Sequence, residues 1–217
     1  MSPLSLAGVR SAVIVAPHPD DETIGAYGLI RALKARSARV RILVVTDGAG
    51  SHPNSARWPR HRLIAERRRE VLAAMRNIGV PAPDVTFLGL PDGGLSDMAS
   101  RVAALLRSAV AQIGAYDLIV LPAQDDDHPD HRAIAVALAR SPARRLHYLV
   151  WPNRQAKSRR ASHYLRLGHQ AAAKRGAITR YRTQMGAITD DPHGFAISRA
   201  ELAGFARPVE LFREVRR

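Results

Sequence analysis

Short runs of apolar, mostly β-branched residues alternate along the chain with longer segments whose apolar residues repeat at helical spacing. The short runs predict buried strands, because an apolar run closed by turn residues is typical of a sheet covered on both faces. We expect strands within residues 12–15, 40–47, 84–90, 117–121 and 144–152. The longer segments predict helices near residues 22–36, 61–79, 97–114 and 131–140.

The alternation of strands and helices predicts the fold class. It indicates an α/β fold, a Rossmann-like three-layer sandwich with a mostly parallel central sheet of about five strands. Residues 208–215 alternate enough to add a C-terminal edge strand. No G-x-G-x-x-G follows the first strand, which argues against a dinucleotide cofactor. With 217 residues and no internal repeat or linker, the chain is expected to form a single domain over residues 1–217.

Composition restricts the environment and the chemistry of the chain. The apolar fraction of 46% can furnish a core, and no apolar stretch is long enough for a membrane span. The N-terminal segment lacks the features of a signal peptide, so we expect a cytoplasmic protein. The absence of cysteine excludes disulfides, thiolate ligands and a cysteine nucleophile. Any bound metal must therefore be held by histidines and carboxylates.

The net charge of +14 and the pI near 11.3 are unusually basic. Nucleic-acid binding is one explanation; an anionic substrate, an acidic membrane surface or a GC-rich genome that favours arginine are others. Aromatic residues make up only 5%, with no RNA-binding signature or zinc finger, so no specific nucleic-acid partner is expected. We favour a diffuse basic surface around an acidic site, which suits phosphate-bearing or lipid-linked substrates. The basic segment 153–182, helical in places, is the best candidate for anionic contacts.

Candidate chemistry appears first in residues 12–22, AVIVAPHPDDE. The two prolines cannot continue a strand ladder, so His18, Asp20 and Asp21 follow the strand, at the sheet edge where α/β proteins bind ligands. Adjacent aspartates repel each other unless a cation or hydrogen-bond donors offset their charge. A histidine and an aspartate three residues apart can bind a metal. The alternative is a polar turn whose aspartate caps the next helix.

Residues 117–131, DLIVLPAQDDDHPDH, repeat this arrangement of an apolar strand, a proline, and then acids and histidines. Because the carboxyl ends of parallel strands meet at one edge of a sheet, the two segments can come together in space. His128 and His131, with the residues of the first motif, are enough for a three-ligand metal site with a spare acid and a spare base. This convergence favours a functional site over two capped turns.

The APHPDDE segment and the later HPDH resemble the PIG-L (LmbE-like) family of metal-dependent N-deacetylases, and the similarity extends from Ala12 to about Gln184. The resemblance implies an enzyme that hydrolyses the N-acetyl group of an N-acetylglucosaminyl or related N-acetyl sugar conjugate, releasing acetate and a free amine. It also implies that His18, Asp21 and His131 bind one divalent metal per chain, Zn²⁺ in first place, with Fe²⁺ and Mn²⁺ as alternatives.

The same resemblance assigns roles to other motif residues. Asp20 matches the general base that activates water. His128 matches a second catalytic histidine, which stabilises the oxyanion or protonates the leaving amine, and Asp130 matches the acid that orients it. Some relatives place a tyrosine before HPDH to support the oxyanion; this chain has aspartates at 125–127, so His128 is expected to carry more of that role. Near the C-terminus, Thr183-Gln184 stands where the family usually has Ser-Gln.

Four further residues are expected at the substrate pocket. The resemblance places Ser51 and His52 on a loop that borders the pocket, although a lone loop histidine is more often solvated. It also places Asp92 in a Leu-Pro-Asp-Gly segment that contacts the sugar, for which a plain β-turn is the alternative. One arginine of residues 67–69 is expected to help hold the substrate, and Arg67 is the candidate because it fits the family's Arg-x-x-Glu pattern.

Two other functions remain open at this point. A basic protein of this charge could bind nucleic acid, in which case binding would be salt-sensitive and independent of His18. The same metal site could also serve a different metallohydrolase, such as an esterase or an amidase with another acyl substrate.

Overall fold

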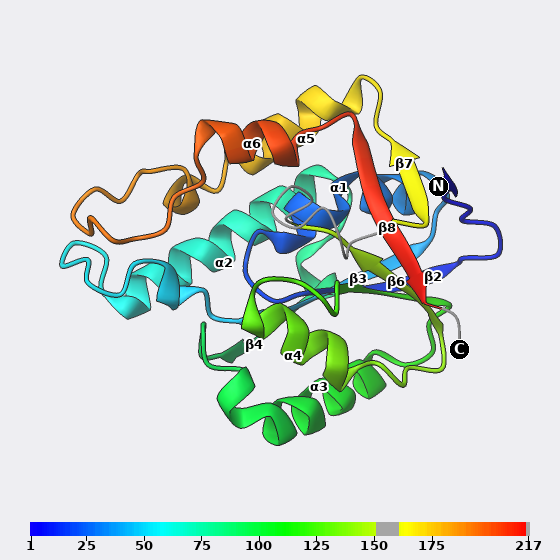
Figure 1. Cartoon of the computed structure of the whole chain (residues 1–217), viewed down its shortest axis with the longest axis horizontal. Helices are drawn as coiled ribbons and strands as arrows, with labels where there is room; N and C mark the ends of the chain where they lie inside the picture. Colours follow the sequence, from blue (N-terminus) through cyan, green and yellow to red (C-terminus); the bar gives the residue numbers. More distant parts are fainter. Residues whose placement is uncertain (151–160, 216–217) are drawn as a thin grey trace.

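The computed structural model describes residues 1–150 and 161–215, in which strands and helices alternate along the chain (Figure 1). The strands are β1 (Ser2–Pro3), β2 (Ser11–Ala16), β3 (Arg39–Thr46), β4 (Val85–Leu90), β5 (Leu118–Pro122), β6 (Arg144–Tyr148), β7 (His163–Arg166) and β8 (Val209–Val215). The α-helices are α1 (Asp21–Ala35), α2 (Arg60–Asn77), α3 (Ala99–Ile113), α4 (Pro129–Ala137), α5 (Gln170–Ile178) and α6 (Arg199–Phe205). Short 3₁₀ turns are η1 (Ala49–Ser51), η2 (Ala82–Asp84), η3 (Ser96–Met98) and η4 (Arg182–Gln184).

The described strands form one sheet in the order β1-β7-β8-β6-β5-β2-β3-β4. Neighbouring strands from β6 to β4 run parallel, as do β1 and β7, while β8 runs antiparallel to both of its neighbours. The prediction of an α/β fold with a mostly parallel sheet is confirmed. The sheet has more strands than predicted, because β1 and β7 are too short to carry a recognisable alternation.

The prediction that the C-terminal strand lies at the edge is wrong. Strand β8 lies inside the sheet, with Glu214 opposite Leu146 on one side and Leu211 opposite Tyr164 on the other. Its alternation correctly indicated a strand but could not show that β7 pairs with its second side. The end of the strand expected at 144–152 and the first part of the basic segment 153–182 lie in residues 151–160, outside the described residues.

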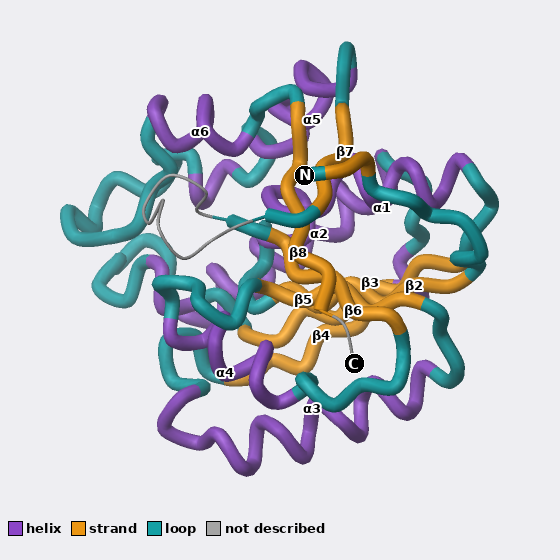
Figure 2. The backbone as a smooth tube through the Cα atoms, turned by 45° about the vertical axis from the view of Figure 1, so that its right-hand side comes forward, coloured by secondary structure: helices purple, strands orange, loops and turns teal. Residues whose placement is uncertain are grey.

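Helices cover both faces of the sheet, as predicted (Figures 1 and 2). Helices α1, α2, α5 and α6 share one core with one face of the sheet, and α3 and α4 share the second core with the other face. Within β2, Ile14 belongs to the first core and Val13 and Val15 to the second, all fully buried. Each buried aliphatic side chain of this kind stabilises the fold by roughly 1.5–3 kcal/mol. No helix in the described part of the chain is both long and apolar enough to cross a membrane.

Helix α1 is interrupted by a buried carboxylate that β8 supplies. Ala26 leaves the helical conformation (φ −140°, ψ 17°), which frees backbone N–H groups of the following turn. Glu210 accepts hydrogen bonds from the N–H groups of Gly28 at 2.8 Å and Leu29 at 3.1 Å. The buried Lys174 donates to the same carboxylate at 2.9 Å. These contacts fix the position of α1, and therefore of the turn that precedes it, on the sheet.

The fold brings the two predicted motifs to one place. The chain passes from β2 to β3 on one side of β2 and returns to β5 on the other side. The residues that follow β2 and β5 therefore meet where the winding direction changes, and this is the position at which open α/β sheets bind ligands.

The close approach of α1 to β6 predicts an unusual response to alanine at Gly25. A Cβ there would lie 2.3 Å from Cδ2 of Tyr148, whose ring is buried and whose hydroxyl donates to the Val15 carbonyl at 2.9 Å. We expect Gly25→Ala to lower the free energy of unfolding by about 1–3 kcal/mol, because the ring cannot move away. Urea unfolding in the presence of a chelator measures this without a contribution from bound metal.

Gly176→Ala is the matched control. Gly176 is an exposed residue of α5 with no atom within 4 Å of an added Cβ. Alanine there should raise the free energy of unfolding by roughly 0.5–1 kcal/mol, the ordinary helix preference over glycine. Equal effects of the two substitutions would contradict the packing described for Gly25.

Candidate functional site

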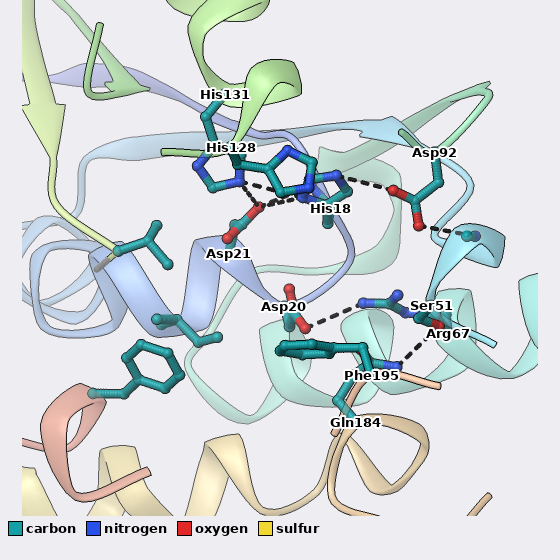
Figure 3. Close-up of a pocket in the computed structure, with 14 residues that line it drawn as sticks. His18, Asp20, Asp21, Ser51, Arg67, Asp92, His128, His131, Gln184 and Phe195 are labelled. Carbon is teal, nitrogen blue, oxygen red and sulfur yellow. Dashed lines mark hydrogen bonds and ion pairs between the residues drawn. The ribbon is translucent and has the colours of Figure 1, made fainter. Parts of the chain in front are cut away.

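A cavity of about 200 Å³ lies where the segments after β2 and β5 meet (Figure 3). Its polar lining comes from the turns after four neighbouring strands, from α2 and from η4: His18, Asp20, Asp21, Gly50, Ser51, Asp92, His128, His131, Arg67 and Gln184. Its apolar lining consists of four residues: Ile24 of α1, Val150 just after β6, Phe195 in the loop before α6, and Phe205 at the end of α6. The cavity thus combines a charged part with an apolar part.

Three donor atoms in this cavity form a nearly equilateral triangle. Asp21 Oδ2 lies 3.2 Å from His18 Nδ1 and 3.2 Å from His131 Nε2, and the two ring nitrogens are 3.3 Å apart. Ligand atoms of a tetrahedral zinc ion, each about 2.0–2.1 Å from the metal, lie about 3.3–3.4 Å from one another. These residues therefore fit a divalent metal with three protein ligands and one position left open.

A carboxylate lies beside the outer nitrogen of both imidazoles of the triangle. The second nitrogen of His18, Nε2, lies 3.1 Å from Asp92 and 3.3 Å from Asp130. The second nitrogen of His131, Nδ1, lies 3.4 Å from the buried Asp126. In each ring the proton of the neutral form then faces a carboxylate, which leaves the other nitrogen with a lone pair for a metal.

The charges of this cluster also fit a bound cation. Burial alone would raise the pKa of Asp21, yet His131 and His18 hold that pKa well below its usual range. Burial would lower the pKa of His131, but Asp21 and Asp126 raise it to about 9. The acids thus require positive charge beside them. A divalent metal bound to neutral imidazoles supplies this charge in place of ring protons.

Two other groups of potential ligands lie close by. The rings of His18, His128 and His131 have nitrogens within 4.8 Å of one another, and so do donor atoms of His18, Asp92 and Asp130. Asp130 is less available, because it already accepts hydrogen bonds from the N–H groups of residues 93 and 95 at 2.8 and 3.0 Å. All three atoms of the triangle lie within 3.3 Å of one another, and we take it as the candidate metal site.

Asp20 lies in the same cavity with its carboxylate toward Arg67 (Figure 3). Arg67 Nη2 donates to Asp20 Oδ2 at 3.1 Å and to the Pro19 carbonyl at 2.8 Å. Burial raises the pKa of Asp20 to about 8, against the attraction of Arg67. The backbone of Asp20 has φ 154° and ψ −24°, a conformation that costs a residue with a Cβ about 1–3 kcal/mol. Such strain at a cavity residue is typical of functional sites.

Helix α2 supplies one lining residue, Arg67, and positions another, Gln184 of η4. Arg67 is the arginine of residues 67–69 that faces the cavity, while Arg69 is exposed and paired with Glu66. One turn further on, Glu70 accepts hydrogen bonds from the N–H of Thr183 at 2.9 Å and from its hydroxyl at 2.6 Å. This contact brings the neighbouring Gln184 into the cavity wall.

Comparison of the sequence with known protein families shows to which family the chain belongs. The model of the PIG-L family, described as GlcNAc-PI de-N-acetylase, matches residues 13–141, which is more than half of the chain and includes both motifs. The chain belongs to the PIG-L family. Residues 142–217, which supply Gln184 and three of the four apolar lining residues, lie outside the match.

Two curated proteins are similar in sequence to this PIG-L chain. A probable N-acetyl-α-D-glucosaminyl L-malate deacetylase 2 of Bacillus cereus is 28% identical over 138 residues, 62% of each chain. A 2′-N-acetylparomamine deacetylase of Streptomyces fradiae is 30% identical over 137 residues, 55% of this chain and 47% of the relative. The chain therefore spans roughly half to three fifths of the length of these relatives.

A solved structure shows the same fold. The N,N′-diacetylchitobiose deacetylase of Pyrococcus horikoshii superposes with a TM-score of 0.70 and 21% identity, covering 96% of this chain and 84% of that chain. At this identity the likeness concerns the PIG-L fold alone.

The structure changes three expectations for individual residues of this PIG-L chain. His52 does not line the cavity; its ring is buried beneath Gly194, where an added Cβ would lie 2.2 Å from His52 Cδ2. The Asp130 carboxylate contacts His18 and not the ring of His128, whose Nδ1 instead accepts the N–H of Asp130 at 3.2 Å. Asp92 lines the cavity, but its two oxygens are engaged by His18 and by the N–H of Gly50.

The sequence did not indicate several residues that line or support the site. Phe195 and Phe205 are single aromatics outside any motif, and only the fold brings them to the cavity. Phe195 is held there because its N–H donates to the Ser51 carbonyl at 2.8 Å. Ile24 could have been found, since it lies one helical turn after Asp21 and therefore on the same face of α1. The sequence shows Asp126 only as one of three consecutive aspartates and does not indicate which of them lies beside His131.

The contact between Asp126 and His131 predicts an effect on metal affinity. Asp126→Asn removes the carboxylate that lies 3.4 Å from Nδ1 of His131, so the dissociation constant for Zn²⁺ should rise about 10- to 100-fold. Competition with a zinc-binding dye measures this constant independently of any activity. Asp127→Asn removes the same charge from the next residue, which is half-buried and outside the cavity lining, and should change the constant by less than about 3-fold. Equal changes in both variants would show that charge, and not ring orientation, accounts for the effect.

Proposed function

We propose that this PIG-L protein is a zinc-dependent N-deacetylase that hydrolyses the acetamide of an N-acetylglucosaminyl or related N-acetyl sugar compound. The observation that supports this best is the triangle of His18, Asp21 and His131 in one cavity with the buried Asp20. Both curated relatives carry the name of a deacetylase that acts on an N-acetylated sugar compound.

The proposed chemistry assigns the base to Asp20. A bound divalent metal would polarise the acetamide carbonyl and lower the pKa of a water molecule to about 7. Asp20 accepts the proton of the attacking water. Burial raises its pKa in the metal-free cavity, and the positive charge of a bound metal would keep the carboxylate ionised near pH 7. The water oxygen adds to the amide carbon, the C–N bond breaks, and the nitrogen takes up the proton that Asp20 accepted from the water. The products are acetate and a free amine.

His128 is proposed to stabilise the oxyanion of this reaction. Its Nδ1 accepts the N–H of Asp130, so the proton of the neutral ring resides on Nε2. Burial, with the nearby His18 and His131, lowers the pKa of His128 to about 4. The ring is therefore neutral near pH 7 and can donate a hydrogen bond from Nε2 to the developing negative charge.

The remaining lining residues are proposed to hold the sugar and its substituent. Ser51 and Gln184 offer polar groups for hydroxyls of the sugar, whereas the oxygens of Asp92 are already engaged by His18 and Gly50. Arg67 donates hydrogen bonds to Asp20 and to two backbone carbonyls, so we propose that it holds the Asp20 base in place and does not bind the substrate. The apolar part of the cavity suits the acetyl methyl and an apolar substituent of the sugar.

Acetate release tests the proposed function. Zinc-loaded protein should release acetate from at least one member of a panel of N-acetyl sugars and their glycosides, and a chelator should abolish the release. Asp20→Asn should lower kcat by about 10²–10⁴-fold, because the base is lost, while the variant still binds zinc.

Parallel assays separate the alternatives. Release from O-acetyl but not from N-acetyl sugars would assign the site to an esterase. Absence of release from every compound, together with tight salt-sensitive binding of nucleic acid by a His18→Ala variant, would contradict the proposal and favour the nucleic-acid alternative.

A further inference from the structure

The strained backbone of Asp20 is held by a side chain from the first turn of α1. The N–H of Asp20 donates to Glu22 Oε2 at 3.2 Å, in addition to the His18 carbonyl at 3.0 Å. Apart from Ser37, Asp20 is the only non-glycine residue with a positive φ in the described part of the chain. A conformation of this kind persists only where surrounding contacts determine it. Glu22 provides such a contact directly at the strained residue.

Glu22 is in turn held by Tyr181, which follows α5 and lies outside the span that the PIG-L family model matches. The Tyr181 hydroxyl donates to Glu22 Oε1, and the Thr23 hydroxyl donates to the same oxygen at 3.0 Å. Glu22 and Tyr181 are both fully buried. Because a buried carboxylate without hydrogen bonds is strongly disfavoured, these two hydroxyl groups fix the orientation of Glu22.

We propose that Tyr181, acting through Glu22, is a positioning residue for the Asp20 carboxylate. Glu22 uses one oxygen for Tyr181 and the other for the Asp20 amide, so a shift of Tyr181 reaches the strained turn through a single carboxylate. Without this support the Asp20 backbone relaxes toward negative φ and turns its carboxylate away from the cavity. The inference rests on the proposed function only in taking Asp20 as the base.

Tyr181 also belongs to the apolar core, so a purely structural role is the alternative. Tyr148 provides a matched control, because it is equally buried and its hydroxyl also donates a hydrogen bond next to β2. The acceptor of Tyr148 is the Val15 carbonyl at 2.9 Å and not Glu22. Removing either hydroxyl deletes one atom. Tyr148→Phe loses one buried hydrogen bond, whereas Tyr181→Phe loses the bond to Glu22 and the 2.8 Å contact with Thr23 Oγ1, so the free energy of unfolding of each variant is measured beside kcat.

The experiment compares Tyr181→Phe with Tyr148→Phe in the zinc-loaded protein. Tyr181→Phe should lower kcat about 10- to 100-fold, because a displaced base misses the attacking water, with KM changed by less than about 2-fold. Tyr148→Phe should leave kcat within about 2-fold of the parent. A crystal structure of Tyr181→Phe should show the backbone of Asp20 outside the positive-φ region.

Glu22→Met is the second variant, since an apolar side chain of similar volume is often tolerated in place of a buried charge. It removes the acceptor of the Asp20 amide and should give the same fall in kcat and the same change at Asp20. An unchanged Asp20 backbone in both Tyr181→Phe and Glu22→Met would overturn the inference, whether or not the parent protein is active. Failure of the parent to release acetate, with Asp20 displaced in both variants, would overturn the proposed function and leave the positioning role intact.

Discussion

Asp21 Oδ2 is shared by two imidazoles that lie 113 positions apart in the chain, and the rest of the site depends on this contact. One carboxylate oxygen between two ring nitrogens places three lone-pair donors within 3.3 Å of one another. Such crowding inside a protein is unfavourable unless a positive charge lies among the donors. The surrounding acids, Asp92, Asp126 and Asp130, strengthen that requirement. The arrangement therefore calls for positive charge among these atoms, which protons on the two rings or a bound metal ion can supply.

The fold gathers these polar groups at one edge of the sheet and holds them in place through well-packed neighbouring elements. Strand β2 lies in the middle of the parallel part of the sheet and is fully buried on both faces, so the turn that follows it has a rigid base. The strain at Asp20 is carried by contacts from α2 and from the first turn of α1. Helix α1 in turn is fixed by Glu210 and Lys174 on the far side of the core. The reactive groups thus stand on well-packed elements, as a site that must hold its geometry requires.

The amino-acid sequence was sufficient for the strands and α-helices between residues 11 and 140 and for the two motifs, because their apolar periods and Pro-flanked acids are local features. It was insufficient where the outcome depends on distant partners. Asp130 was expected to orient His128 but contacts His18, because the N–H groups of residues 93 and 95 hold its carboxylate there. His52 is buried outside the cavity lining, and Gly194, far along the chain, packs on its ring. The apolar lining and the internal position of β8 likewise arise from tertiary contacts that no local pattern records.

Crystals of the protein grown with zinc and measured on both sides of the zinc absorption edge show whether the two motifs bind one metal ion through His18, Asp21 and His131. We expect one anomalous peak per chain, about 2.0–2.2 Å from His18 Nδ1, Asp21 Oδ2 and His131 Nε2. A peak bound by a different set of residues, or zinc-soaked crystals with no peak in this cavity, would contradict this expectation.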